Sequence, residues 1–198
     1  MVEELELKTI EEYAKINNIP IMQKDGINFL TNFIKKNNIK NILEIGTAIG
    51  YSSIKMALTD DDIHVTTIER DSARYMEALK NIKNFDLDDR ITIIFKDALE
   101  VTLDDKYDLI FIDAAKAQNE KFFLRFSDNL DTNGYIVTDN LNFHGLVFKD
   151  IDEIESKNVK GLVRKVKDYT QFLKDNKDFV TDFYDVGDGI SISKRDVK

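Results

Sequence analysis

Residues 107–140, YDLIFIDAAKAQNEKFFLRFSDNLDTNGYIVTDN, decide the fold of this chain. An apolar run, YDLIFID, is followed by a helical stretch near 119–130 and then by a second apolar run, GYIVTD. Both runs are typical of strands that are buried on both faces. A strand, a helix and a second strand in succession predict a parallel pair joined by a right-handed crossover.

The same alternation continues towards the N-terminus. Three more apolar runs predict strands, and helices are expected from about Tyr51 and Ser72: the runs are NILEIG (41–46), HVTTIE (64–69) and RITIIF (90–95). Two helices are expected first, at roughly 3–17 and 24–37. The sequence therefore predicts an α/β fold with a doubly wound, Rossmann-like arrangement.

Towards the C-terminus, a hairpin is expected after a basic helix. The segments DFVTDFYDV (178–186) and ISISK (190–194) flank Gly187, Asp188 and Gly189, which is a strong turn signal. Two N-terminal helices, a mostly parallel seven-stranded sheet and a C-terminal antiparallel hairpin then make up one domain over residues 1–198.

Composition excludes several kinds of site. The chain has no cysteine, which excludes disulfides, thiolate zinc sites, Fe–S clusters and cysteine nucleophiles, and it fits a reducing, cytoplasmic setting. The N-terminus is acidic and helical in period, and no apolar stretch approaches membrane-spanning length, so neither export nor membrane insertion is expected. The net charge of −9 argues against indiscriminate coating of nucleic acid.

Oxygen-bearing side chains follow two of the expected strands. Asp113 closes the run YDLIFID, and Asp139 and Asn140 close the run GYIVTDN. Because parallel strands end at one edge of a sheet, these side chains should lie close together, where open α/β folds bind ligands. Two carboxylates and an amide suit a hard divalent cation, Mg²⁺ before Mn²⁺ or Ca²⁺. The sequence thus predicts metal-assisted chemistry on an oxygen-rich substrate.

The turn after the first strand bears on the choice of cofactor. If the G-x-G-x-x-G fingerprint of dinucleotide sites begins at Gly46, its second and third glycines are replaced by Ala48 and Tyr51. NAD and FAD are therefore disfavoured as cofactors. Glu44 before the turn would repel a phosphate and suit an amino group. Two further carboxylates end the next two strands, where Glu69 could accept hydrogen bonds from ribose hydroxyls and Asp97 could reach an adenine amino group. S-adenosylmethionine fits this arrangement best.

Each of these residues has a simpler interpretation. Acidic residues at strand ends are often helix N-caps, and Lys116 could be a surface lysine, although a lysine beside a cation can serve as a base. His64 and His144 are expected in structural or solvent-facing roles. Five basic residues between 157 and 167, four of them at helical spacing, could form a solvated helix face: Lys157, Lys160, Arg164, Lys165 and Lys167.

Across nearly its whole length the chain resembles the cation-dependent class I S-adenosylmethionine O-methyltransferases, which include the catechol and caffeoyl-coenzyme A enzymes. The segments that carry the resemblance are IMQKDGINFL, LEIGTAIGYSSIKMA, TTIERD, KDALE, LIFIDAAKAQNEKFF and VTDNLNFHGLV. The resemblance implies cofactor contacts by these residues: Met22, Glu44, Gly46, Ser52, Glu69, Asp97, Ala98 and Asp113. It also implies that Asp113, Asp139 and Asn140 hold Mg²⁺, so that Asp113 is catalytic as well, and that Lys116 is the general base. Many relatives have glycine where this chain has Ala48.

The C-terminal part, with the basic helix and the ending VGDGISISK, is similar to a bacterial branch that methylates 5-hydroxyuridine at the wobble position of transfer RNA. This resemblance implies that the five basic residues contact phosphates of an anticodon loop. We also expect the protein to be a homodimer. A catechol-like phenol is the alternative substrate. A nonenzymatic cofactor-binding protein and a nucleotide-dependent dehydrogenase are alternatives from other classes.

Overall fold

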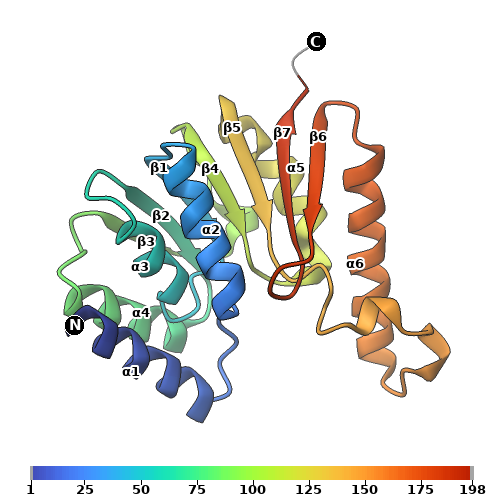
Figure 1. Ribbon diagram of the computed structural model, residues 1–198, viewed down its shortest axis with the longest axis horizontal. Coiled ribbons are helices and arrows are strands. Elements are labelled where there is room, and N and C mark those ends of the chain that lie inside the picture. Colours follow the sequence, from blue (N-terminus) through green and yellow to red (C-terminus); the bar gives the residue numbers. More distant parts are fainter. Residues whose placement is uncertain (1, 197–198) are drawn as a thin grey trace.

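The computed structural model describes residues 2–196 and contains a seven-stranded sheet in the order β3-β2-β1-β4-β5-β7-β6 (Figure 1). The strands are β1 (Asn41–Ile45), β2 (His64–Glu69), β3 (Ile91–Phe95), β4 (Tyr107–Ile112), β5 (Leu130–Thr138), β6 (Phe179–Tyr184) and β7 (Ile190–Arg195). Strands β1 to β5 are parallel, whereas β7 is antiparallel to both of its neighbours, β5 and β6. The predicted mostly parallel α/β sheet with a C-terminal hairpin is confirmed.

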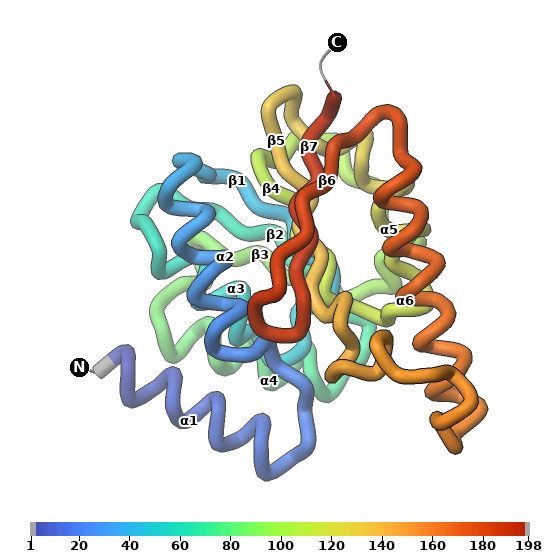
Figure 2. The backbone as a smooth tube through the Cα atoms, turned by 45° about the vertical axis from the view of Figure 1, so that its right-hand side comes forward, coloured from blue at the N-terminus to red at the C-terminus, as the bar shows by residue number. Residues whose placement is uncertain are grey.

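Helices cover both faces of the sheet. They are α1 (Val2–Ile16), α2 (Lys24–Lys36), α3 (Tyr51–Ala57), α4 (Ser72–Asn84), α5 (Asn119–Phe126) and α6 (Lys157–Asp175). Figure 2 shows α5 and α6 on one side of the sheet, and α1 to α4 on the other. The helices that follow β1 and β2 thus lie on one face, and those that follow β4 and β5 lie on the other, as a doubly wound fold requires.

Periodic apolar residues attach the helices to the sheet. In α2, Ile27, Leu30 and Ile34 are fully buried on one stripe. Helix α6 begins after Ser156, whose side chain accepts a hydrogen bond from the Val159 N–H as an N-cap. Its buried face includes Tyr169, whose hydroxyl lies 2.9 Å from that of Thr138 in β5.

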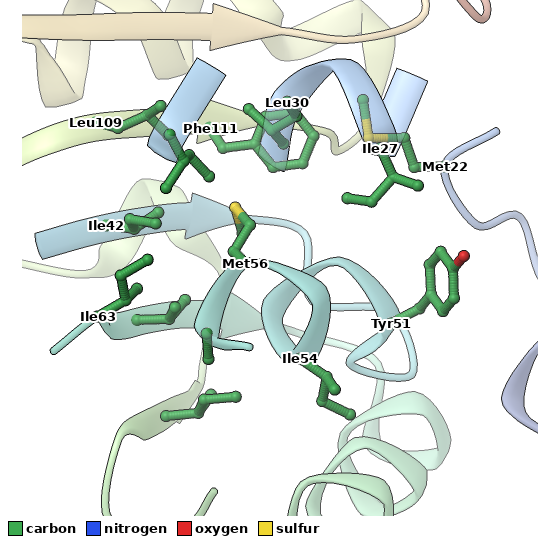
Figure 3. Packing of buried hydrophobic residues seen from close by; sticks show 14 of the residues in the cluster. Met22, Ile27, Leu30, Ile42, Tyr51, Ile54, Met56, Ile63, Leu109 and Phe111 are labelled. Carbon is green, nitrogen blue, oxygen red and sulfur yellow. The ribbon is translucent and has the colours of Figure 1, made fainter. Parts of the chain in front are cut away.

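Two apolar cores result, one on each face of the sheet. The core beneath α2 and α3 is continuous from Ile42 and Ile63 to Met22 and Tyr51, which lie beyond the carboxyl end of β1 (Figure 3). This core therefore borders the carboxyl edge of the sheet, where ligands are expected.

The helix expected near 119–130 is shorter than predicted. It ends at Phe126, a 3₁₀ turn follows (Ser127–Asn129), and β5 already begins at Leu130. Tyr107 pairs with Leu130 but Leu109 pairs with Tyr135, so residues 131–134 bulge out of the ladder. Their polar character hid this irregular start of the strand from a periodicity analysis.

No helix within residues 2–196 combines the length and the apolar character that crossing a membrane would require.

Candidate functional site

A cavity of about 300 Å³ opens at the carboxyl ends of the parallel strands, between the turn after β1 and the end of β4. Strand order reverses at this point, with β2 and β3 on one side of β1 and β4 and β5 on the other. Such switch points are the usual ligand sites of open α/β sheets. All but two of the residues expected to bind the cofactor or the cation line the cavity: Met22, Gly46, Ser52, Glu69, Asp97, Ala98, Asp113 and Asn140.

Backbone geometry explains the composition of the turn after β1. Gly46 has φ of 105°, and a Cβ there would lie 2.3 Å from the Asp113 carbonyl oxygen, so only glycine allows the two strand ends to approach. Ala48 also has a positive φ, 46°. A left-handed conformation is more favourable for glycine than for alanine, so the turn is strained at Ala48.

Glu44 does not line the cavity, which corrects the expectation that its carboxylate faces an amino group of the cofactor. The side chain is fully buried beneath the turn and accepts hydrogen bonds from the hydroxyls of Ser52 (2.5 Å), Thr67 (2.6 Å) and Ser53. Burial raises the pKa of Glu44 to about 7, although the three hydroxyls oppose the shift. Its role here is to hold together β1, β2 and α3.

Glu69 and Asp97 line the cavity, and both also make backbone contacts. Glu69 accepts three bonds from main-chain N–H groups, at Ala48 (2.8 Å), Arg70 (2.9 Å) and Asp71 (2.8 Å). A carboxylate has about four acceptor positions, so about one is left for a ligand. Asp97 caps the turn Ala98–Glu100 through the Leu99 N–H, and that bond, together with Arg70, lowers its pKa.

The three residues expected to hold a cation are brought together by the sheet. The Asp113 N–H bonds to the Ile45 carbonyl and the Asp139 N–H to the Ile112 carbonyl, so both aspartates continue the ladder at adjacent strand ends. Asn140 follows with φ of 66°, and its side-chain amide donates to Asp139 Oδ2 at 3.2 Å. Burial, and then the neighbouring Asp113, raise the pKa of Asp139 to about 8; burial likewise raises the pKa of Asp113.

This edge suits a divalent cation. Asp139 is only 3% exposed, yet its Oδ1 has no hydrogen-bond partner among residues 2–196. A buried carboxylate oxygen without a donor costs free energy unless a ligand or cation pairs with it. Within the same residues no three acidic, histidine or cysteine side chains form a metal-binding group, so the amide of Asn140 would have to complete the set.

Lys116 reaches the same edge from the 3₁₀ turn Lys116–Gln118. Its Nζ donates to Asn140 Oδ1 at 2.7 Å and lies 5.7 Å from the centroid of the Phe143 ring. The ammonium opposes the raised pKa of both aspartates. Lys116 is therefore placed beside the residues expected to hold a cation.

The five basic residues lie on α6, which packs against the Lys116–Gln118 turn. All are exposed except Lys160, which is partly buried, with its Nζ 3.8 Å from an Asp152 oxygen. The acidic residues just before the helix reduce the local positive charge: Asp150, Asp152, Glu153 and Glu155.

Two residues of the site were not foreseen. His144 lines the cavity, although a structural or solvent role was expected for it. Asp188 was noted only as a turn residue, but it is 3% exposed and contributes to the raised pKa of Asp113 and Asp139. Both depend on contacts between distant loops, of which the local pattern carries no trace.

Comparisons with known proteins bear on the family and the fold of the chain. A family model described as O-methyltransferase matches residues 1–196. A caffeoyl-CoA O-methyltransferase of Populus kitakamiensis is 26% identical over 98% of this chain and 86% of its own length. The crystal structure of a Staphylococcus aureus protein, provisionally described as a caffeoyl-CoA O-methyltransferase, is 41% identical with a TM-score of 0.92, covering 96% of this chain and 92% of that one. An O-methyltransferase of Bacillus cereus, solved in complex with SAH, shares the fold (TM-score 0.79, 24% identity, covering 96% and 90%).

Proposed function

The chain belongs to the O-methyltransferase family, and on that premise we propose that it moves a methyl group from S-adenosylmethionine to a hydroxyl oxygen in a cation-dependent reaction. The observation that carries the proposal is the edge formed by Asp113, Asp139 and Asn140 beside the cavity. Mg²⁺ is the cation that these oxygen ligands suit best.

The donor would bind along the turn after β1. Glu69 has an acceptor position left, which would take a ribose hydroxyl, and Asp97, which lines the same cavity, would accept a bond from an adenine amino group. Met22 and Ala98 would form apolar parts of the cavity wall. When bound, S-adenosylmethionine supplies an electrophilic methyl group and the cation supplies Lewis-acid stabilisation of an ionised hydroxyl.

The residues of the chain would orient the acceptor and move its proton. Asp113, Asp139 and Asn140 would hold the cation, and Lys116 Nζ, as the neutral amine that remains after it has released its own proton to solvent, would take up the hydroxyl proton at the same edge. Fixing both substrates against one rigid sheet edge supplies proximity and orientation, which contribute a large part of the rate of such transfers.

For the acceptor we favour 5-hydroxyuridine at the wobble position of transfer RNA. Its hydroxyl lies beside a carbonyl oxygen, so it offers the same pair of oxygens as a catechol. Support comes from α6, because Figure 1 shows that the loop leading into this basic helix lies at the same end as the arrowheads of β4 and β5. Phosphates could thus contact α6 while a base enters the cavity.

A catechol-like phenol is the second candidate acceptor. The names of the relatives in Populus and Staphylococcus favour it, and so do the acidic residues that precede α6. On this alternative the basic face of α6 is merely solvated.

Labelled methyl transfer from S-adenosylmethionine tests both candidates. Transfer RNA that bears 5-hydroxyuridine and a catechol panel are compared with Mg²⁺ or with a chelator, and products are identified by nucleoside analysis. Cation-dependent 5-methoxyuridine supports the RNA acceptor, and labelled phenols alone would exclude it. Full transfer in chelator would refute the cation requirement.

The contribution of α6 is tested with a charge-matched pair of triple variants. Lys157→Gln, Arg164→Gln and Lys165→Gln remove three exposed charges near the site. The control changes three exposed lysines at the opposite end of the sheet: Lys36→Gln, Lys83→Gln and Lys177→Gln. Losing three phosphate contacts to single-stranded RNA should reduce the slope of log affinity against log salt by about 2. Equal slopes for the two triples would exclude a phosphate role for α6.

A further inference from the structure

We infer that Asp188, in the turn between β6 and β7, is a positioning residue that anchors the loop 139–145 and thereby holds Asn140 in place to bind the cation. This inference rests on the proposed function and adds a residue to it. Asp188 is almost completely buried at 3% exposure, although it lies in a hairpin turn, where aspartate is normally solvated.

Hydrogen bonds tie the loop to this turn along its whole length. The Asp188 carboxylate accepts a bond from the His144 N–H (2.5 Å), and the Asp188 carbonyl accepts one from the Asn142 N–H (2.7 Å). The Leu141 N–H bonds to the Gly189 carbonyl at 2.9 Å. The contact is so close that a Cβ on Gly189 would lie 2.7 Å from the Asn142 side chain. The hydrogen bonds that hold the loop to the turn thus begin at Leu141, the residue directly after Asn140.

The loop needs such an anchor because its backbone is strained. Asn140, Phe143 and His144 have φ angles of 66°, 44° and 56°, in the left-handed region that residues with a Cβ rarely adopt. For a bulky residue such as Phe143 this conformation is unfavourable and persists only when surrounding contacts enforce it. Without the Asp188 carboxylate, the loop would relax and carry Asn140 with it.

The second carboxylate oxygen links the anchor to the cavity. Asp188 Oδ2 lies 3.3 Å from His144 Nδ1, within ion-pair distance, but the two atoms are not aligned for a hydrogen bond. The His144 imidazole lines the cavity, and its side chain is 68% exposed. Because Nδ1 of His144 lies next to the Asp188 carboxylate, the other ring nitrogen, Nε2, is the one left to contact the substrate that accepts the methyl group. The same aspartate therefore orients two groups of the site.

Asp188 acts on the cation site through the loop. Together with Asp113 and Asp139 it does not form a metal-binding group in the part of the chain that the structure describes. Residues that orient metal ligands without binding the metal typically change its affinity by 10–100-fold when they are removed. An effect of that size, transmitted by Asn140, is what the anchor should produce.

The test measures the affinity for Mn²⁺ alone, by electron paramagnetic resonance, and the affinity for S-adenosylmethionine without cation, by calorimetry. Asp188→Ala removes the bond to the His144 N–H and should weaken Mn²⁺ binding 10–100-fold, with donor affinity within about twofold. Asp188→Asn keeps an acceptor oxygen and should lose less than tenfold. In an Asn140→Ala background, Asp188→Ala should have no further effect. Asp182→Asn, an exposed aspartate on β6, is the control.

Three results would overturn the inference: a folded Asp188→Ala protein that binds Mn²⁺ like the wild type, an Asp188→Asn loss equal to that of alanine, or full additivity with Asn140→Ala. If Asp188→Ala does not fold, hydrogen exchange of the wild type decides, since the His144 amide must then be protected, and fast exchange refutes the anchor. Failure of the wild type itself to bind Mn²⁺ would instead refute the proposed function.

Discussion

Glu44→Gln should make the stability of the protein less dependent on pH. Glu44 is fully buried and its pKa is raised to about 7, against an ordinary value of 4.5, chiefly by burial. Between these two values the folded protein holds a proton on Glu44 that the unfolded chain has released. The folded state then binds more protons than the unfolded state, so stability falls as the pH rises through this window.

The size of the effect follows from the two pKa values. A difference of 2.5 units between 4.5 and about 7 corresponds to about 3 kcal/mol, which is present in full well below pH 4.5 and is lost as the pH rises through 7. Between pH 5 and pH 8, about 2–3 kcal/mol of it should disappear. Glutamine cannot ionise, and the hydroxyls of Ser52, Ser53 and Thr67 can rotate to accept bonds from its amide. The variant should therefore lack this loss.

Urea unfolding in chelator, at intervals from pH 5 to pH 8.5, measures the free energy of unfolding of both proteins. The quantity to compare is the difference between Glu44→Gln and the wild type, because groups common to both proteins cancel. This difference should rise in favour of the variant by about 2–3 kcal/mol from pH 5 to pH 8. Glu12→Gln, on the exposed face of α1, is the control and should follow the wild type. If the difference in free energy of unfolding between the two proteins stays constant with pH, Glu44 is not protonated in the folded protein, and the reasoning is refuted.

Three further predictions concern the site. Asp139→Asn should lower turnover by about 100-fold or more while donor affinity measured by calorimetry is unchanged; wild-type turnover would exclude Asp139 as a ligand. Lys116→Met should lower kcat by about 10²-fold or more at an unchanged KM for the donor in steady-state assays, and a kcat within threefold would remove Lys116 from proton transfer. Ala48→Gly should raise the free energy of unfolding by about 0.5–1 kcal/mol in urea, because φ is 46° there; a decrease would contradict the strain argument.

The sheet and most of its ligand edge could be predicted because their signals are local. An apolar run followed by an oxygen-bearing residue identifies both a buried strand and its end, and parallel pairing then places Asp113 and Asp139 side by side. The start of β5 was not predicted, because residues 131–134 bulge out of the ladder and carry polar side chains. The homodimer, the cytoplasmic location and the RNA acceptor stay predictions.

Glu44 shows why residue type and position were not sufficient. A carboxylate before the turn could point to the cavity or beneath it, and the choice depends on the hydroxyls of Ser52, Ser53 and Thr67. Of these, Thr67 comes from β2, so the set of hydroxyls that donate to Glu44 is complete only once β1 and β2 have paired. Strand pairing thus decides between a ligand contact and a structural one.

Asp188 shows how topology recruits a residue that its local sequence marks only as part of a turn. Strand β7 is antiparallel to β5 and β6 is antiparallel to β7, so β6 runs in the same direction as β5. The turn after β6 must then lie at the carboxyl edge of the sheet, where β4 and β5 deliver Asp113 and Asp139. Because β7 is inserted between β5 and β6, this turn reaches the loop 139–145 at close range and buries its aspartate there. In a hairpin of sequential order, β6 instead of β7 would lie next to β5, so the end of β6, and not Asp188 and Gly189, would face the loop, and Asn140 would lack this support.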